Sequence, residues 1–293
     1  MTKKTSNKKS PRKGSSILST LLIIICLAVM AYAGYRLVSL FLEYKAGQDQ
    51  YKDLQGFTSS EDTGVDSSAT DSTSGADIAS QDIPSGTLLY SETPNTWPDG
   101  LKDPISVDFV SLRSINQDVV GWIYIEPLGI SYPVAHGTDN DYYLHHTFKK
   151  TYLFSGSIFM DAQNIGDFTD ANTILYGHNM KDGSMFAGLK KYTSQELYKE
   201  NPYIWVLTPQ YNYAYRIFSL QTVSPDSDIY TLFTETIDQT FLDWANKMYS
   251  QSSVSLDKPN FAGNSRVLTL STCTSDGSNR TVVQAALCAI TKP

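Results

Sequence analysis

Eight short segments rich in β-branched and aromatic residues recur over the C-terminal part of the chain. Such residues suit a pleated, half-buried surface, and turn-forming residues such as Pro127 and Gly129 separate the segments. The segments are residues 119–125, 130–135, 156–161, 172–178, 203–208, 213–223, 266–273 and 280–290. This succession predicts a mostly β domain. A closed or nearly closed barrel fits it better than a sandwich, although strand number alone leaves both open.

Two helices are expected beside these strands. One precedes the first strand, and its apolar residues at helical spacing are Ile105, Phe109 and Leu112. The other covers residues 236–251, carries its apolar residues on one face, and begins with Thr236 and Gln239 at the spacing of a capping box. The second helix therefore lies between the strand at 213–223 and the last two strands.

The N-terminus predicts export of the domain. Residues 1–14 carry lysine and arginine without any acid, and residues 15–42 form an apolar run in which Arg36 is the only charge. About 20 apolar residues span a bilayer, and the basic flank stays in the cytoplasm, so we predict a single membrane anchor with the C-terminal bulk outside the cell. Residues 31–33 (Ala-Tyr-Ala) also resemble a signal-peptidase site, and cleavage there is the alternative.

The composition changes to Ser, Thr, Asp and Gly in residues 43–100. Eleven acids against two lysines give this segment a net charge of −9, and it has few large apolar residues. Such a segment cannot bury enough surface to order itself, which predicts a flexible spacer whose first part, up to about Leu54, extends the membrane helix. Residues 101–293 form the predicted globular domain. Their net charge of −5 and the lack of a basic patch argue against a nucleic-acid partner.

Three cysteines do not make a disulfide framework. Cys26 lies in the membrane run and reads as a small apolar filler, and Cys288 lies in an apolar run and reads as a core thiol. Cys273 differs, because it ends an apolar strand and a polar loop follows it directly. A bridge between Cys273 and Cys288 is conceivable in an oxidising compartment. No cysteine and histidine cluster has the spacing of a zinc site.

Cys273, His178 and Arg280 are the residues that could carry chemistry. A thiol attacks as thiolate, which a nearby cation favours, and Arg280 follows Cys273 across a short loop. His178 ends the apolar strand at 172–178 and is the candidate base, whereas the permanently charged Arg280 could only bind an oxyanion or the substrate backbone. The rival bases are His136, His145 and His146. A core thiol, a structural histidine and a solvated arginine remain the ordinary alternatives, because proximity in the fold is not readable from spacing.

The sequence resembles the sortase family. LTLSTC, followed by a loop and RTVVQAAL, is similar to the sortase signature that joins a TLxTC strand to an arginine. TDNDYYLHHTF, GSIFMD and TILYGHNMKDGSMFAGLKKY resemble class B sortases in particular, and the likeness extends from Ile105 to the C-terminus. The resemblance implies a closed eight-stranded β-barrel with an N-terminal helical addition and a helix before the cysteine strand.

The same resemblance implies a cysteine transpeptidase that acts on secreted proteins with a C-terminal sorting signal of NPxTx type. Cys273 would attack the threonine carbonyl and form a thioacyl enzyme, and His178 would protonate the leaving amine. Arg280 would position the signal and stabilise the oxyanion. An amine, typically of a peptidoglycan cross-bridge, would then release the product. The calcium-binding acids of class A sortases have no counterpart here, so neither a metal nor another cofactor is expected.

The family's substrate groove also maps onto this sequence. The resemblance implies that the substrate-binding residues are Asn140, Leu144, Tyr230, Leu232, Ser271 and Thr272. Plain core packing is the alternative for the two leucines. Three other functions stay open: a sortase that polymerises pilins, an exported cysteine peptidase that hydrolyses its acyl enzyme, and a surface binding domain whose Cys273 is inert.

Overall fold

The computed structural model of the protein describes residues 14–59, 88–91, 103–234 and 237–293. The chain divides into two compact units, Met1–Ala46 and Gly47–Pro293. The basic tail at residues 1–13, most of the predicted spacer and Thr236 of the predicted capping box lie outside the described residues.

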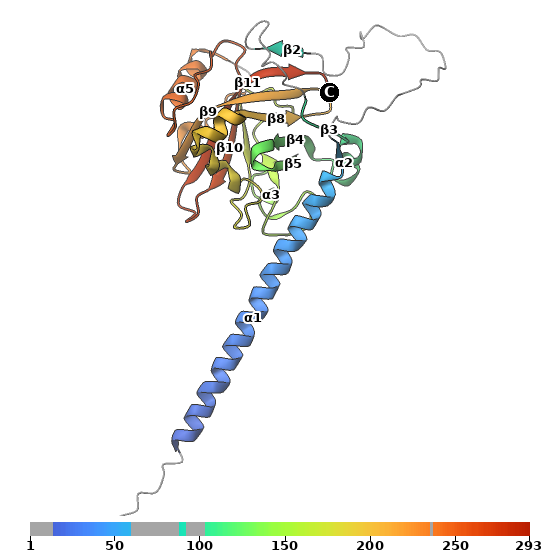
Figure 1. The fold of residues 1–293 in the computed structure, drawn as a ribbon. Helices are drawn as coiled ribbons and strands as arrows, with labels where there is room; N and C mark the ends of the chain where they lie inside the picture. Colours follow the sequence, from blue (N-terminus) through green and yellow to red (C-terminus); the bar gives the residue numbers. More distant parts are fainter. Residues whose placement is uncertain (1–13, 60–87, 92–102, 235–236) are drawn as a thin grey trace, which may run out of the picture. The chain divides into compact units, whose positions relative to one another are not determined.

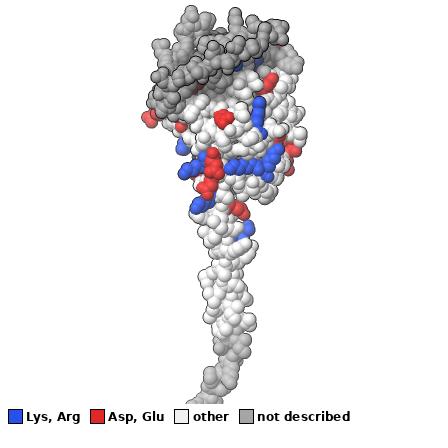
Figure 2. Space-filling view, turned by 90° about the vertical axis from the view of Figure 1, so that its right-hand side faces the viewer, with Lys and Arg blue, Asp and Glu red and all other residues white. Residues whose placement is uncertain are grey.

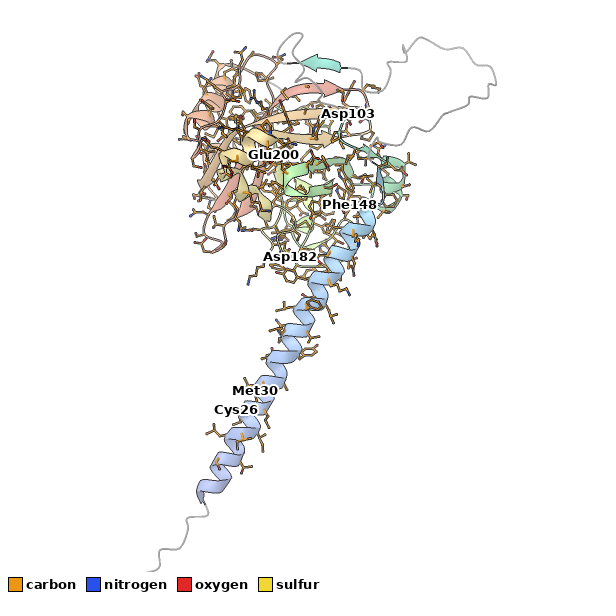
Figure 3. All side chains as sticks on the ribbon, in the orientation of Figure 1. Cys26, Met30, Asp103, Phe148, Asp182 and Glu200 are labelled. Carbon is orange, nitrogen blue, oxygen red and sulfur yellow. The ribbon has the colours of Figure 1, made fainter. Side chains whose placement is uncertain are left out.

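The first unit is the N-terminal part of one long helix, α1 (Gly14–Gln55). Its apolar side chains are exposed, and Figure 2 shows the surface of this helix as almost entirely uncharged. Cys26 and Met30 project from it (Figure 3). Within the described residues, α1 alone is long and apolar enough to cross a membrane, either as an anchor or as a signal sequence.

The second unit is built on a β-barrel (Figure 1). The barrel strands are β4 (Val119–Ile125), β5 (Ile130–His136), β6 (Ile158–Met160), β7 (Asn172–Tyr176), β8 (Tyr203–Leu207), β9 (Asn212–Val223), β10 (Val267–Cys273) and β11 (Arg280–Thr291). They neighbour one another in the order β10-β7-β6-β5-β4-β8-β9-β11, and β11 pairs with β10 to close the ring. The closed eight-stranded barrel expected from the sequence is confirmed.

The barrel is mixed in direction. β10 runs parallel to β7, and β5 runs parallel to β6, whereas the other barrel neighbours are antiparallel. A further strand, β2 (Leu88–Ser91), pairs with the C-terminal end of β11 beyond the part that β10 occupies. The parallel β7–β10 pair matters most for function, because both strands deliver their C-terminal ends to the same rim of the barrel.

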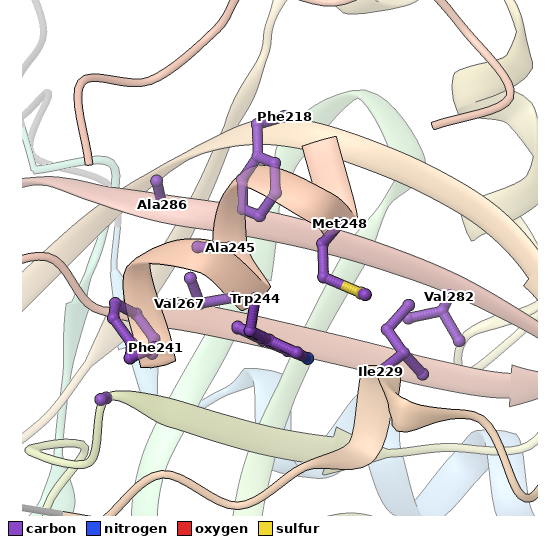
Figure 4. Packing of buried hydrophobic residues seen from close by; sticks show 10 residues of the cluster. Phe218, Ile229, Phe241, Trp244, Ala245, Met248, Val267, Val282 and Ala286 are labelled. Carbon is purple, nitrogen blue, oxygen red and sulfur yellow. The ribbon is translucent and has the colours of Figure 1, made fainter. Parts of the chain in front are cut away.

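Helix α5 (Gln239–Ser250) precedes β10, as expected, and covers the outside of the barrel (Figure 4). Its buried residues Phe241, Ala245 and Met248 pack against barrel residues that include Val267 and Val282. The predicted capping box is wrong: the N-cap is Asp238, whose carboxylate accepts a hydrogen bond from the backbone N–H of Phe241. The N–H of the third helical residue is thereby satisfied.

The helix before the first strand, α2 (Phe109–Ile115), is shorter than its apolar pattern suggests. Asp108 caps it by accepting from the N–H of Ser111, so Ile105 lies outside the helix although its side chain is buried. The preceding residues form β3 (Ser106–Val107), which pairs with β1 (Thr58–Ser59). The other short elements are η1 (Glu126–Leu128), α3 (Tyr142–His145), η2 (Ala187–Thr193), α4 (Gln195–Glu200) and η3 (Asp228–Tyr230).

The C-terminal end of α1 belongs to the second unit. Residues 47–55 continue the helix, and Tyr51 and Leu54 are buried against the barrel domain. The Tyr51 hydroxyl donates to the carbonyl of Gly156 (2.5 Å), and Gln48 donates to Asp182 (2.8 Å). In Figure 3, Phe148 and Asp182 lie beside this helix end. The predicted spacer boundary at residue 43 therefore falls inside a helix whose last two turns are packed.

We expect Tyr51→Phe to destabilise the barrel domain by about 1–3 kcal/mol, because it leaves the buried Gly156 carbonyl without its donor. The hydroxyl is completely enclosed, and burial raises the Tyr51 pKa, so it stays a neutral donor. Urea unfolding of the full chain measures the effect. Tyr211→Phe, at a half-exposed tyrosine after β8, is the control, and an equal shift in both variants would contradict the prediction.

Candidate active site

Cys273 and Arg280 face each other across the last hairpin. Cys273 is the final residue of β10, Arg280 is the first residue of β11, and the two are direct antiparallel partners. Residues directly opposite each other in adjacent strands point to the same side of the sheet. The thiol and the guanidinium therefore share one rim and one face of the barrel.

The hairpin loop between them is held by Asp276. Its carboxylate accepts from the hydroxyls of Thr274 and Ser278 and from the Ser278 N–H, and these bonds lower the pKa of Asp276 to about 2. The loop also closes through a bond from the Thr274 N–H to the carbonyl of Asn279 (3.0 Å). A short but fully hydrogen-bonded loop thus fixes Arg280 opposite Cys273.

His178 reaches the same rim from β7. The last β7–β10 pair is Tyr176 with Ser271, so His178 and Cys273 each lie two residues beyond it. Because side chains alternate and the strands are parallel, both point to the same face. The connection continues past the strands: the N–H of Gly177 donates to the carbonyl of Ser271 (3.2 Å), and the Asn179 amide donates to the carbonyl of Cys273 (2.9 Å).

A buried polar ladder ties the three strands together on this face. The Thr269 hydroxyl of β10 donates to Asn172 of β7 (2.7 Å) and accepts from the Gln284 amide of β11 (3.2 Å). All three side chains are buried, where hydrogen bonds of this kind are costly to break. The ladder keeps the strands that carry His178, Cys273 and Arg280 in register.

The ring of His178 is oriented by a backbone carbonyl. Its Nε2 lies 2.8 Å from the carbonyl oxygen of Leu144 in α3. A carbonyl can only accept, so Nε2 carries the proton of the neutral ring and Nδ1 carries the lone pair. Burial lowers the pKa of His178 below its ordinary value of 6.5, and the charge of His145 lowers it further, while the Leu144 carbonyl acts in the opposite direction. The neutral ring can accept a proton at Nδ1.

This shift predicts how stability depends on pH. Below about pH 6.5 an unfolded histidine binds a proton that the folded protein resists binding, so His178 makes the native state less stable as the pH falls. Wild type should therefore lose more free energy of unfolding than His178→Gln between about pH 7.5 and 5.5. Urea titrations at both pH values test this, and an equal loss in the two proteins would rule the effect out.

The comparisons with known proteins agree with this geometry. Residues 123–288 match the sortase domain family, and this match covers β5 to β10 completely. The chain belongs to the sortase family. Sortase B of Listeria monocytogenes is 41% identical over 180 residues, which cover 60% of this chain and 72% of that protein. Sortase B of Staphylococcus aureus is 35% identical over 191 residues, covering 64% and 77% respectively.

Solved sortase structures share the fold. The crystal structure of sortase B from Bacillus anthracis in complex with AAEK1 has a TM-score of 0.62 at 27% identity, covering 85% of this chain and 99% of that one. The Staphylococcus aureus sortase B–substrate complex has a TM-score of 0.57 at 32% identity, covering 62% of this chain and 84% of that one. The protein is a class B sortase, a cysteine transpeptidase of the cell-wall sorting type.

One wall of the sortase site comes from η3, and α5 holds that wall in place. The Tyr230 hydroxyl lies 2.8 Å from the Ser271 hydroxyl, two residues before Cys273. Trp244 of α5 donates to the Asp228 carbonyl (2.8 Å), and Lys247 pairs with the Asp228 carboxylate. Burial raises the pKa of Tyr230, whereas the hydrogen bond with Ser271 and the positive charge of Arg280 lower it. Tyr230 and Ser271 are thus joined beside the thiol.

Asn140, which precedes α3, is already hydrogen-bonded within the protein. Its amide donates to the Asp161 carboxylate (2.9 Å), and its carbonyl accepts from the Ala162 N–H (2.8 Å). Tyr176 also donates to Asp161 (2.9 Å), and burial together with this carboxylate raises the Tyr176 pKa. The sequence interpretation missed Asp161, although an acid directly after the apolar residues 158–160 was a visible signal.

Leucines 144 and 232 are both half-buried, so neither is a full core residue. Leu144 contributes its carbonyl to His178, a role that no side-chain pattern indicates. Thr272 is buried at 5% exposure, and its hydroxyl has no hydrogen-bond partner in the described part of the chain. Since Val267 faces α5, alternation turns Ser271 and Cys273 outward and Thr272 into the barrel. The Thr272 hydroxyl therefore points away from the rim.

The three rival histidines have surroundings that differ from those of His178. His136 closes β5, and its Nε2 is buried without a partner in the described residues. His146 stacks on Tyr142 (4.1 Å between ring centroids), and its Nδ1 lies 2.8 Å from the Tyr142 carbonyl. His145 lies nearest, with its ring 6.5 Å from that of His178.

The three cysteines are free. Cys288, expected to be a core thiol, is half-buried rather than fully buried, and its Sγ lies 3.2 Å from the Ala214 carbonyl. Among the described residues no group of three or more His, Cys, Asp and Glu side chains could hold a metal ion.

Proposed function

We propose that this sortase cleaves an NPxTx-type C-terminal sorting signal on secreted proteins through a thioacyl enzyme on Cys273. His178 exchanges the proton with the leaving amine, and Arg280 binds the oxyanion and the signal backbone. The observation that carries this proposal is the rim geometry: Cys273 and Arg280 are cross-strand partners, and His178 ends the parallel neighbour strand. Tyr230, Ser271, Asn140, Leu144 and Leu232 supply the groove, to which Thr272 contributes through its backbone.

The product of this reaction joins the threonine carboxyl to an amine of the peptidoglycan cross-bridge. We also propose that α1 anchors the enzyme as a single span, with its N-terminus in the cytoplasm and the barrel domain outside. The apolar surface of α1 and the basic residues that precede it support this orientation. N-terminal sequencing of the cell-associated protein distinguishes a retained anchor from a helix that is cleaved after Ala33.

Mass spectrometry of the full chain in detergent tests the proposed reaction. Wild type incubated with an NPxTx-type peptide should gain the mass of the acyl fragment on Cys273, and adding triglycine should convert that adduct into ligated peptide. Hydrolysis at an undiminished rate in the presence of triglycine would instead indicate a cysteine peptidase. A lysine-bearing pilin peptide that replaces triglycine with greater efficiency would indicate pilin polymerisation.

A further inference from the structure

The segment that supports His178 carries an unusual set of exposed aromatic side chains. In the described part of the second unit, the exposed large apolar residues are Val110, Tyr142, Tyr152, Phe154, Ile165 and Tyr211. Half of them lie within residues 142–154. Single exposed apolar residues are ordinary, whereas a group of them beside a reactive site indicates binding.

Histidine rings lie between these aromatic side chains and connect them to His178. Phe154 is 58% exposed and stacks on His178, with 5.4 Å between centroids and 22° between planes. Tyr152 is 72% exposed and lies edge-on to His146 at 5.5 Å. Tyr142 stacks on His146, with 4.1 Å between the ring centroids. We call Tyr142, Tyr152 and Phe154 the aromatic wall.

The charge around the aromatic wall favours a cation. The two lysines in the same segment are neutralised by ion pairs, Lys149 with Asp53 (3.3 Å) and Lys150 with Asp118 (2.9 Å). Asp139 lies at the start of α3, and hydrogen bonds from the backbone of Tyr142 and Asp141 lower its pKa, so it is ionised at neutral pH. The faces of Tyr and Phe rings attract ammonium ions within about 6 Å of the centroid.

We propose that the aromatic wall is the acceptor subsite, which holds the incoming primary amine as an ammonium ion beside His178. This inference rests on the proposed transpeptidase function and adds the place and chemistry of the second substrate. An acceptor bound there approaches the thioacyl carbon on Cys273 from the side of His178 and Phe154, and the sorting signal keeps the groove already described. Binding the ammonium ion raises the local concentration of the acceptor over that of competing solvent.

The proton balance fits this position. The ammonium ion gives one proton to Nδ1 of the neutral His178 and becomes a free amine. The amine nitrogen then forms a C–N bond with the thioacyl carbon, the C–S bond breaks, and the second proton passes to the Cys273 sulfur. The products are an amide, a thiol and an imidazolium. The imidazolium later returns its proton to solvent or to the next leaving amine.

The test compares charged and uncharged nucleophiles in full-length protein. Tyr152→Leu and Phe154→Leu keep apolar volume and remove the ring face. We expect each to raise the KM for triglycine about 3- to 10-fold and to lower the ratio of ligated to hydrolysed peptide. The KM for hydroxylamine, which is uncharged at neutral pH, should not change. Tyr211→Leu, at the far end of the barrel, is the matched control and should leave both values as in wild type.

Equal changes in the KM values for triglycine and hydroxylamine would overturn the proposal, because the aromatic wall would then only cover His178. Unchanged KM values for both nucleophiles would also overturn it, because the rings would then not bind the acceptor. Nα-acetyllysine amide in place of triglycine shows whether an ε-amine or an α-amine gains more from the rings.

A binding measurement separates this inference from the proposed function. Ring resonances of Tyr152 and Phe154 should shift on titration with triglycine amide and not with N-acetyltriglycine amide, which lacks the ammonium group. If they do so while no thioacyl adduct forms, the ammonium site stands and the proposed reaction fails. If the adduct forms and the rings respond equally to both peptides, the ammonium site is refuted.

Discussion

Cys273→Ala is expected to abolish the thioacyl adduct and to lower turnover of a sorting-signal peptide by at least about 10⁴-fold. The reaction proceeds through a covalent bond to sulfur, and alanine offers no nucleophile to replace it. The substitution removes a half-buried side chain at a strand end, so the fold should survive. Steady-state kinetics and intact mass spectrometry on the same preparation measure both effects.

Cys288→Ala is the matched control for the thiol itself. It removes the other cysteine of the barrel domain. Cys288 lies on β11, far along the strand from Arg280, which is the first residue of that strand. Its activity should equal that of wild type, and an alkylating reagent should still label Cys273. Full activity in Cys273→Ala would support the reading of the domain as a surface binding module with an inert thiol.

Arg280→Lys is expected to lower kcat/KM by about 10²–10³-fold while the barrel stays folded. Lysine keeps the charge but loses the planar fork that can hold an oxyanion and a second acceptor at once. In the free enzyme the guanidinium bonds the carbonyls of Asn279 (3.0 Å) and Gly277 (3.3 Å), so its donors already converge at the loop beside Cys273. Arg113→Lys, on the exposed side of α2, is the control.

The way in which the effect of Arg280→Lys divides between kcat and KM identifies the role of Arg280. A fall in kcat with little change in KM indicates an interaction made only in the transition state, as expected for an oxyanion donor. A rise in KM alone would assign Arg280 to holding the signal. Unimpaired activity of Arg280→Lys would show that a point charge suffices and would reject the bidentate role.

Local patterns predicted most of the fold. Every strand expected from runs of β-branched and aromatic residues is present. Such residues, as at 119–125, pack well on the two faces of a sheet. The pairing of Cys273 with Arg280 was also within reach, since a short polar loop between two strands makes them antiparallel neighbours. The register places the two residues directly opposite each other, and the guanidinium bonds the loop carbonyls of Gly277 and Asn279.

Other features depend on contacts between distant parts of the chain. Asn179 and Cys273 lie 94 positions apart, and only the parallel pairing of β7 with β10 brings His178 to the thiol. The Leu144 carbonyl that orients His178 belongs to the backbone and leaves no trace in residue type. The inward direction of the Thr272 side chain follows from the β10 face that packs on α5, which no local pattern shows. The resemblance to sortases assigned roles to Cys273, His178 and Arg280 where spacing could not, but it did not indicate the Leu144 carbonyl.

The position of β10 in the ring has a consequence for when the enzyme becomes active. β10 and β11 are the last strands of the chain, yet β10 lies between β7 and β11 and closes the barrel. Until they are in place, β7 and β9 have unpaired edges, and His178 has no thiol beside it. Cys273, Arg280 and barrel closure therefore depend on the same hairpin. A chain that lacks this hairpin has neither the proposed nucleophile nor a closed barrel, so the proposed acyl transfer requires β10 and β11 to be in place.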